Sequence, residues 1–211
     1  MTDSIVTWPN GRLIADDIKL FEDGQWLNDM CILYYFDIIL TNKYRNHPKW
    51  KDVILMDPSL VFAIQFEDDP EDLDQLLDGL NLSQRRCLII PLNDNSDPSV
   101  SCGGSHWSLL VLSRLTTLQP WRFVYYDSAM GKSVPLAARG VSKKITGNDC
   151  CIKDGECSKQ TNSSDCGVYV LAFAERFLEA FLYGDNLCLN DISPNYISSL
   201  RKSILMIVAD L

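Results

Sequence analysis

The apolar positions of this chain recur with helical spacing in several stretches. Residues 70–80 show the pattern most clearly, because Asp69 is a suitable N-cap and Pro70 suits the first turn of a helix. The apolar side chains of this stretch fall on one helical face, at Leu73, Leu76, Leu77 and Leu80. Similar patterns predict helices over 58–66, 134–144, 166–182 and 194–210. The stretch 26–41 is apolar on most faces, which predicts a buried helix, and Asn28 or Asp29 can cap its start.

Continuous apolar runs between turn signals predict strands in the middle of the chain. The runs cover 86–92, 106–112 and 122–127, and a shorter one covers 151–156. The segment 93–98 is rich in Asn, Asp and Pro, which favours a turn. Strands flanked by helices indicate an α+β protein, and we expect residues 1–211 to form a single catalytic domain.

Composition narrows the class of protein. With 46% hydrophobic and 22% charged residues the chain is globular, and its net charge of -9 argues against nucleic acid as the main partner. No run of 18 apolar residues occurs, and residues 1–10 lack the pattern of a secretion signal, so we expect no membrane span and no export. Eight cysteines without such a signal indicate free thiols in a reducing compartment, the cytoplasm or the nucleus.

The cysteines do not have the spacing of a zinc site. Cys150, Cys151 and Cys157 cluster, but no pair has the two-residue gap that brings both sulfurs to one ion. We therefore expect neither a metal nor another cofactor.

One cysteine has a setting that suits catalysis. Cys166 follows Asp165, a residue type that caps helices, and opens a long apolar segment. A helix N-terminus favours the thiolate form of a cysteine, which is the nucleophilic form. We expect Cys166 to be a nucleophile at the start of a helix, and a buried structural thiol is the alternative for any single cysteine.

Three further side chains supply groups that a cysteine nucleophile needs. His106, one of only two histidines, begins a predicted strand, and Asp127 ends another. They are the candidate general base and its orienting carboxylate. Gln160, six residues before Cys166, is a candidate donor to the oxyanion, together with a backbone N–H. Taken singly, each of these residues also has a structural interpretation.

Four motifs, in this order, resemble those of the ubiquitin-like-protein proteases, the sentrin/SUMO-specific cysteine peptidases. The motifs are Trp26-Leu27-Asn28-Asp29, His106-Trp107-Ser108-Leu109, Tyr126-Asp127-Ser128 and Gln160-Thr161-Asn162-Ser163-Ser164-Asp165-Cys166-Gly167. The resemblance covers the chain from about residue 26 to the last helices. It implies a papain-like architecture with a central mixed sheet, a nucleophile at a helix N-terminus and a monomeric enzyme.

The resemblance also implies roles for individual residues. The catalytic roles fall to Cys166 as nucleophile, His106 as base, Asp127 as orienting carboxylate and Gln160 as oxyanion donor. Trp26 and Trp107 would line a narrow tunnel for a Gly-Gly tail, because only residues without a side chain fit between two indoles. Asp29 would hold the backbone of that tail. Without the resemblance, either tryptophan is a core residue.

Within this family the chain resembles the deneddylase branch, which carries an Asn-Asp-Asn-Ser run like residues 93–96. The implied activity is cleavage after the C-terminal Gly-Gly of a Nedd-type modifier, both in its precursor and in lysine-linked conjugates such as cullins. A SUMO-directed protease and a non-catalytic modifier-binding module are the alternatives. The stretch between Asp127 and Gln160 matches no family pattern.

Overall fold

The computed structural model describes residues 6–100, 103–131 and 133–209, and they form two compact units. Unit 1 comprises the described residues of Met1–His47, Ser128–Met130 and Glu156–Leu211. Unit 2 comprises those of Pro48–Asp127 and Gly131–Gly155.

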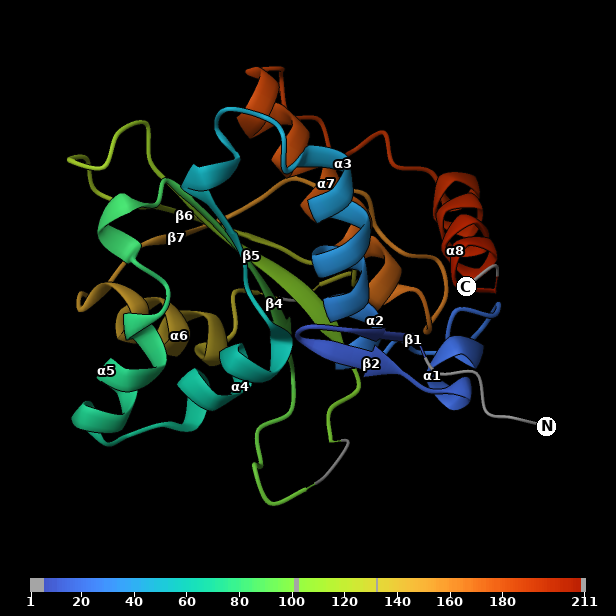
Figure 1. The fold of residues 1–211 in the computed structure, drawn as a ribbon, viewed down its shortest axis with the longest axis horizontal. Helices are drawn as coiled ribbons and strands as arrows, with labels where there is room; N and C mark the ends of the chain where they lie inside the picture. Colours follow the sequence, from blue (N-terminus) through green and yellow to red (C-terminus); the bar gives the residue numbers. More distant parts are fainter. Residues whose placement is uncertain (1–5, 101–102, 132, 210–211) are drawn as a thin grey trace. The chain divides into compact units, whose positions relative to one another are not determined.

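A five-stranded mixed sheet is the centre of unit 2 (Figure 1). Its strands lie in chain order: β3 (Val53–Leu55), β4 (Cys87–Asn93), β5 (Trp107–Ser113), β6 (Arg122–Tyr126) and β7 (Ile152–Asp154). The three middle strands are antiparallel, whereas β3 and β7 pair in parallel with β4 and β6. Parallel pairing needs a crossover connection. Helices provide it both between β3 and β4 and between β6 and β7.

These crossover helices build the core of unit 2. They are α4 (Pro58–Phe66), α5 (Pro70–Asp78) and α6 (Leu136–Thr146), with short 3-10 turns η2 (Trp50–Asp52) and η3 (Leu82–Gln84). α4 packs against β4, α5 and α6. Alternate positions along β4 and β5 face this core, as the pleat of a sheet requires. The strands contribute Leu88, Ile90, Leu92, Leu110 and Leu112, and the helices contribute Val61, Ile64, Val141 and Ile145.

Unit 1 is mainly helical. An N-terminal hairpin, β1 (Val6–Trp8) and β2 (Gly11–Leu13), leads into α1 (Ala15–Lys19) and then α2 (Asp29–Tyr34). The π-helix η1 (Tyr35–Leu40) and α3 (Thr41–Tyr44) continue α2 without a break. The last two helices are α7 (Cys166–Tyr183), which is buried along most of its length, and α8 (Pro194–Ala209).

A buried carboxylate joins α7 to the α2–α3 segment within unit 1. Glu175 accepts hydrogen bonds from the Tyr35 hydroxyl at 2.6 Å and from the Lys43 Nζ at 2.7 Å. The ammonium and the hydroxyl satisfy a charge that would be costly to bury alone.

The local signals placed most elements correctly. Asp69 caps α5 by accepting from the N–H groups of Glu71 and Asp72, as predicted. In the stretch 26–41 the helix starts at Asp29, and Asn28, one of the two predicted caps, caps it by accepting from the Cys31 N–H at 2.9 Å. The strand predicted over 106–112 begins one residue later.

Other boundaries and some elements differ from expectation. The helix predicted over 134–144 covers 136–146, and the strand predicted over 151–156 has three residues. The predicted helix end at Asp210 lies outside the described residues. The unpredicted short elements include β1, β2, α1, β3, η2 and η3, because runs of three to five residues carry almost no periodicity. None of the helices in the described ranges is long and apolar enough to cross a membrane.

Candidate active site

Unit 2 brings together the predicted base and its carboxylate. His106 directly precedes β5 and Asp127 directly follows β6. These strands are antiparallel neighbours, so the start of one and the end of the other share a sheet edge. The His106 Nε2 lies 2.7 Å from the Asp127 Oδ1, and both side chains are buried. A histidine and an aspartate that are 21 positions apart thus form a hydrogen-bonded pair.

The bond uses one particular nitrogen of the imidazole ring. With Nε2 donating to the carboxylate, the proton-accepting nitrogen of a neutral His106 is Nδ1. The carboxylate thereby sets the tautomer and the orientation of the ring.

A tyrosine hydroxyl holds the second oxygen of the same carboxylate. The Tyr125 hydroxyl donates to the Asp127 Oδ2 at 2.9 Å. Burial raises the pKa of Tyr125, so the hydroxyl keeps the proton that it donates. Sequence reasoning missed Tyr125. The available signal was its spacing, because residues i and i+2 project on the same side of a strand.

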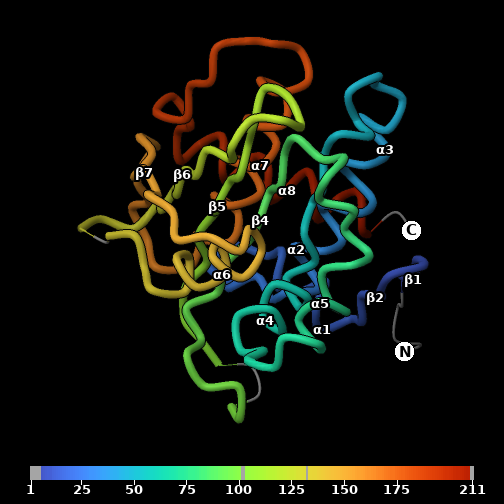
Figure 2. Tube along the Cα trace, turned by 90° about the vertical axis from the view of Figure 1, so that its left-hand side faces the viewer, coloured from blue at the N-terminus to red at the C-terminus, as the bar shows by residue number. Residues whose placement is uncertain are grey.

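The Asn-Asp-Asn turn positions the backbone of His106. The Asp94 Oδ1 accepts from the Ser105 N–H at 2.5 Å and from the His106 N–H at 2.9 Å. Gly104 has φ +86, and a β-carbon there would lie 1.9 Å from the Asn93 Oδ1, so only glycine fits. Figure 2 shows residues 94–100, which follow β4, extending beyond the end of the sheet. The turn predicted from composition thus supports the histidine.

A small cavity of about 70 Å³ borders the His106–Asp127 pair within unit 2. Its lining also includes the hydroxyl-bearing residues Ser108, Tyr125 and Ser133. The pair therefore borders an open space that is partly lined by hydroxyl-bearing residues.

In unit 1, Cys166 is the first residue of α7 and is 3% exposed. The expectation that the Asp165 side chain caps this helix is wrong, since it makes no cap hydrogen bond. Its carboxylate instead accepts from the Asn162 Nδ2 at 2.7 Å and from the Arg201 Nη2 at 2.8 Å. The Asn162 Oδ1 in turn accepts from the Ser164 and Asp165 N–H groups. Side-chain pairing across unit 1 therefore replaces the local cap.

Gln160 has a defined amide orientation. The Ser128 hydroxyl donates to the Gln160 Oε1 at 2.6 Å, and the Gln160 backbone N–H donates to the Ser128 carbonyl at 2.8 Å. The Gln160 Nε2 donates to the Asn162 carbonyl at 2.7 Å. The amide nitrogen therefore points toward the turn that leads into Cys166, and it carries a second hydrogen.

The predicted tail-binding residues have contrasting settings. In unit 1, Trp26 precedes α2 and is 47% exposed, and Asp29 is the first residue of α2. Their segment touches α7, because a β-carbon at Gly167 would lie only 2.9 Å from the Leu27 Cβ. In unit 2, Trp107 opens β5 and is 8% exposed. Trp26 thus has the exposed indole that a ligand can contact.

A long helix that starts at a cysteine, a histidine bonded to a carboxylate and an α+β fold with a mixed sheet are features that cysteine proteases combine. Residues 151–207 match the model of the Ulp1 protease family, C-terminal catalytic domain. NEDD8-specific protease 1 of Arabidopsis thaliana is 31% identical to this chain, over 99% of the chain and 94% of that protein. The chain belongs to the Ulp1 protease family.

A second relative and a solved structure are also similar to this chain. Human sentrin-specific protease 8 is 26% identical, over 95% of this chain and 94% of that protein. The X-ray structure of the C-terminal Ulp1 protease domain, in complex with Smt3, the yeast ortholog of SUMO, superposes with a TM-score of 0.74 at 17% identity, covering 100% of this chain and 89% of that one. This likeness confirms the predicted α+β fold class.

Proposed function

We propose that this protein is a thiol isopeptidase and endopeptidase that cleaves after the C-terminal Gly-Gly of a ubiquitin-like modifier of the NEDD8 type. The similarity to a protease named for NEDD8, over almost the full length of both chains, supports the choice of modifier. The observation that carries the catalytic part is the 2.7 Å bond between the His106 Nε2 and the Asp127 Oδ1. A module that only binds the modifier has no use for a buried, tautomer-fixed histidine.

In the proposed reaction, the His106 Nδ1 accepts the proton of the Cys166 thiol. The thiolate attacks the carbonyl carbon of the modifier's last glycine and forms a tetrahedral oxyanion. The second amide hydrogen of Gln160 and the backbone N–H of Cys166 donate to this oxyanion. Asp127 keeps the ring in place and stabilises the imidazolium.

The intermediate collapses when the carbon–nitrogen bond to the lysine amine, or to the peptide tail of the precursor, breaks. His106 returns its proton to the leaving nitrogen, and a thioester between the modifier and Cys166 remains. His106 then takes a proton from water, which attacks the thioester carbonyl. The modifier leaves with a free carboxylate, and the thiol is regenerated.

Trp26, Trp107 and Asp29 are the proposed tail-binding residues. Two indoles admit glycines and exclude larger side chains, and a carboxylate accepts from the backbone N–H groups of the tail. The proposed substrates are the modifier precursor and lysine-linked conjugates such as cullins. The proposed compartment is the cytoplasm or the nucleus, where thiols stay reduced, and seven cysteines of the described residues are free.

A panel of modifiers with a C-terminal thiol-reactive group tests this proposal. We expect the NEDD8 probe to label Cys166 much faster than SUMO and ubiquitin probes do. Cys166→Ala should abolish labelling and turnover while binding to the intact modifier persists. Cys151→Ala, which removes an exposed thiol, is the control and should react like wild type. Faster labelling by the SUMO probe would reject the choice of modifier, and labelling of Cys166→Ala would reject the nucleophile.

A further inference from the structure

A buried arginine in the C-terminal helix has no role in the proposed reaction. Arg201 lies in α8 and is 1% exposed, which is unusual for a guanidinium. All of the hydrogen-bond partners described below belong to unit 1. They come from two segments that are far apart in the sequence.

The first segment is the loop that follows α1. The Arg201 Nη1 donates to the carbonyl oxygens of Leu20 at 2.8 Å and Glu22 at 3.0 Å. The Nη2 donates to the Gln25 carbonyl at 2.9 Å. Gln25 directly precedes Trp26, so these bonds hold the backbone that enters the proposed tail-binding segment.

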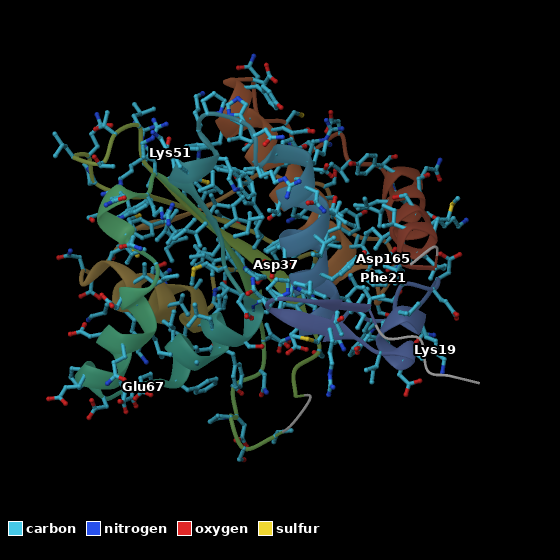
Figure 3. The ribbon with its side chains drawn as sticks, viewed as in Figure 1. Lys19, Phe21, Asp37, Lys51, Glu67 and Asp165 are labelled. Atoms are coloured by element: carbon cyan, nitrogen blue, oxygen red, sulfur yellow. The ribbon has the colours of Figure 1, made fainter. Side chains whose placement is uncertain are left out.

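The second segment is the turn that precedes α7. The Arg201 Nη2 also donates to the Asp165 Oδ1 at 2.8 Å and to the Ser164 carbonyl at 3.4 Å. Asp165 directly precedes Cys166. Phe21 and Asp165, labelled in Figure 3, mark the two segments.

We propose that Arg201 is a positioning residue that sets the spacing between the tail-binding segment and the nucleophile. One planar guanidinium bonds both backbones, so neither can shift without losing bonds on the other side. The contact between Leu27 and Gly167 reinforces the same spacing. Binding of the modifier's tail at Trp26 and Asp29 then holds its last glycine at a fixed distance from Cys166, the first residue of α7.

Lysine is the informative substitution at this position. A lysine keeps the positive charge beside Asp165, but a single ammonium does not reproduce the fork that spans both segments. Because the proposal rests on the proposed function, two readouts are needed. One is cleavage of a modifier fusion, and the other is backbone amide hydrogen exchange, which requires no substrate.

We expect Arg201→Lys to lower kcat/KM for a modifier fusion by on the order of 20-fold, because small displacements of reacting groups strongly reduce rates. The rate at which iodoacetamide alkylates Cys166, a reaction that does not use the tail-binding segment, should change by less than about threefold. Amide exchange should accelerate in both 20–28 and 160–167. Asp165→Asn, which keeps the loop carbonyl bonds, should accelerate exchange only in 160–167.

Val208→Ala is the matched control, since Val208 is a buried residue of α8 outside both sets of bonds. It should lower Tm while kcat/KM, measured well below Tm, stays near the wild-type value. The proposal is overturned if Arg201→Lys keeps the wild-type kcat/KM, or if it accelerates exchange in only one segment. A wild-type protein that cleaves no modifier would refute the proposed function alone, because the exchange data would still decide the role of Arg201.

Discussion

Alanine substitutions at two helical glycines test whether the packing between the Trp26 segment and α7 is rigid. A β-carbon at Gly167 would lie 2.9 Å from the Leu27 Cβ, whereas one at Gly140 in α6 would have no described atom within 4 Å. Alanine at each position is the same chemical change in two helices. We expect opposite results.

Gly140→Ala should stabilise the protein, because alanine loses less backbone entropy than glycine in a helix, by about 0.5–1 kcal/mol. At Gly167 the new carbon lies well inside the usual carbon–carbon contact distance of about 3.5–4.0 Å. The opposing Leu27 Cβ is attached to the backbone and has little freedom to move. Overpacking of this kind costs about 1–3 kcal/mol, so Gly167→Ala should lose about 1–2 kcal/mol after the gain in helix propensity.

Thermal unfolding and cleavage of a modifier fusion measure both effects. For a chain of this length, Tm should rise by about 1–4 °C in Gly140→Ala and fall by about 2–8 °C in Gly167→Ala. Displacing Leu27 also displaces Trp26, so kcat/KM of Gly167→Ala should drop about tenfold, with no change in Gly140→Ala. A Gly167→Ala protein as stable and active as Gly140→Ala would show that Leu27 yields freely, and the argument for fixed spacing would fail.

Three other variants probe the interior of each unit. Tyr125→Phe removes the donor to Asp127, so kcat should fall about tenfold with little change in KM, and a raised KM at unchanged kcat would contradict this role. Glu175→Ala leaves the buried Tyr35 hydroxyl without its acceptor, while Lys43 keeps the Glu179 carboxylate at 3.2 Å, and should cost about 1–3 kcal/mol in urea unfolding, whereas a loss below about 0.5 kcal/mol would mean that the hydroxyl finds another partner. Burial raises the pKa of the Cys31 thiol to about 12. The unfolded thiol ionises at lower pH than the folded one, so the free energy of unfolding should decline as pH rises from about 9 to 12. Cys31→Ala should show a shallower decline, and an equal slope would exclude this contribution.

Sequence patterns predicted the elements whose signals are local. The Asp69 cap, Pro70 and the leucine spacing placed α5 within two residues of its observed end. Apolar runs placed the three middle strands within one residue. The same reasoning failed for Asp165, because its carboxylate accepts from Arg201, a residue of α8, and makes no cap hydrogen bond.

The sequence by itself determined which residues are candidates for chemistry: Cys166, His106, Asp127 and Gln160 stand in recognisable motifs, because caps, periodicity and motif spacing act between near neighbours. Only the tertiary structure decided what holds these residues. It placed the Asp127 carboxylate on the Nε2 of a histidine 21 positions away, and it brought the Arg201 guanidinium to a carbonyl 181 positions away. Strand pairing and helix packing create such contacts between distant segments, and no local pattern contains them.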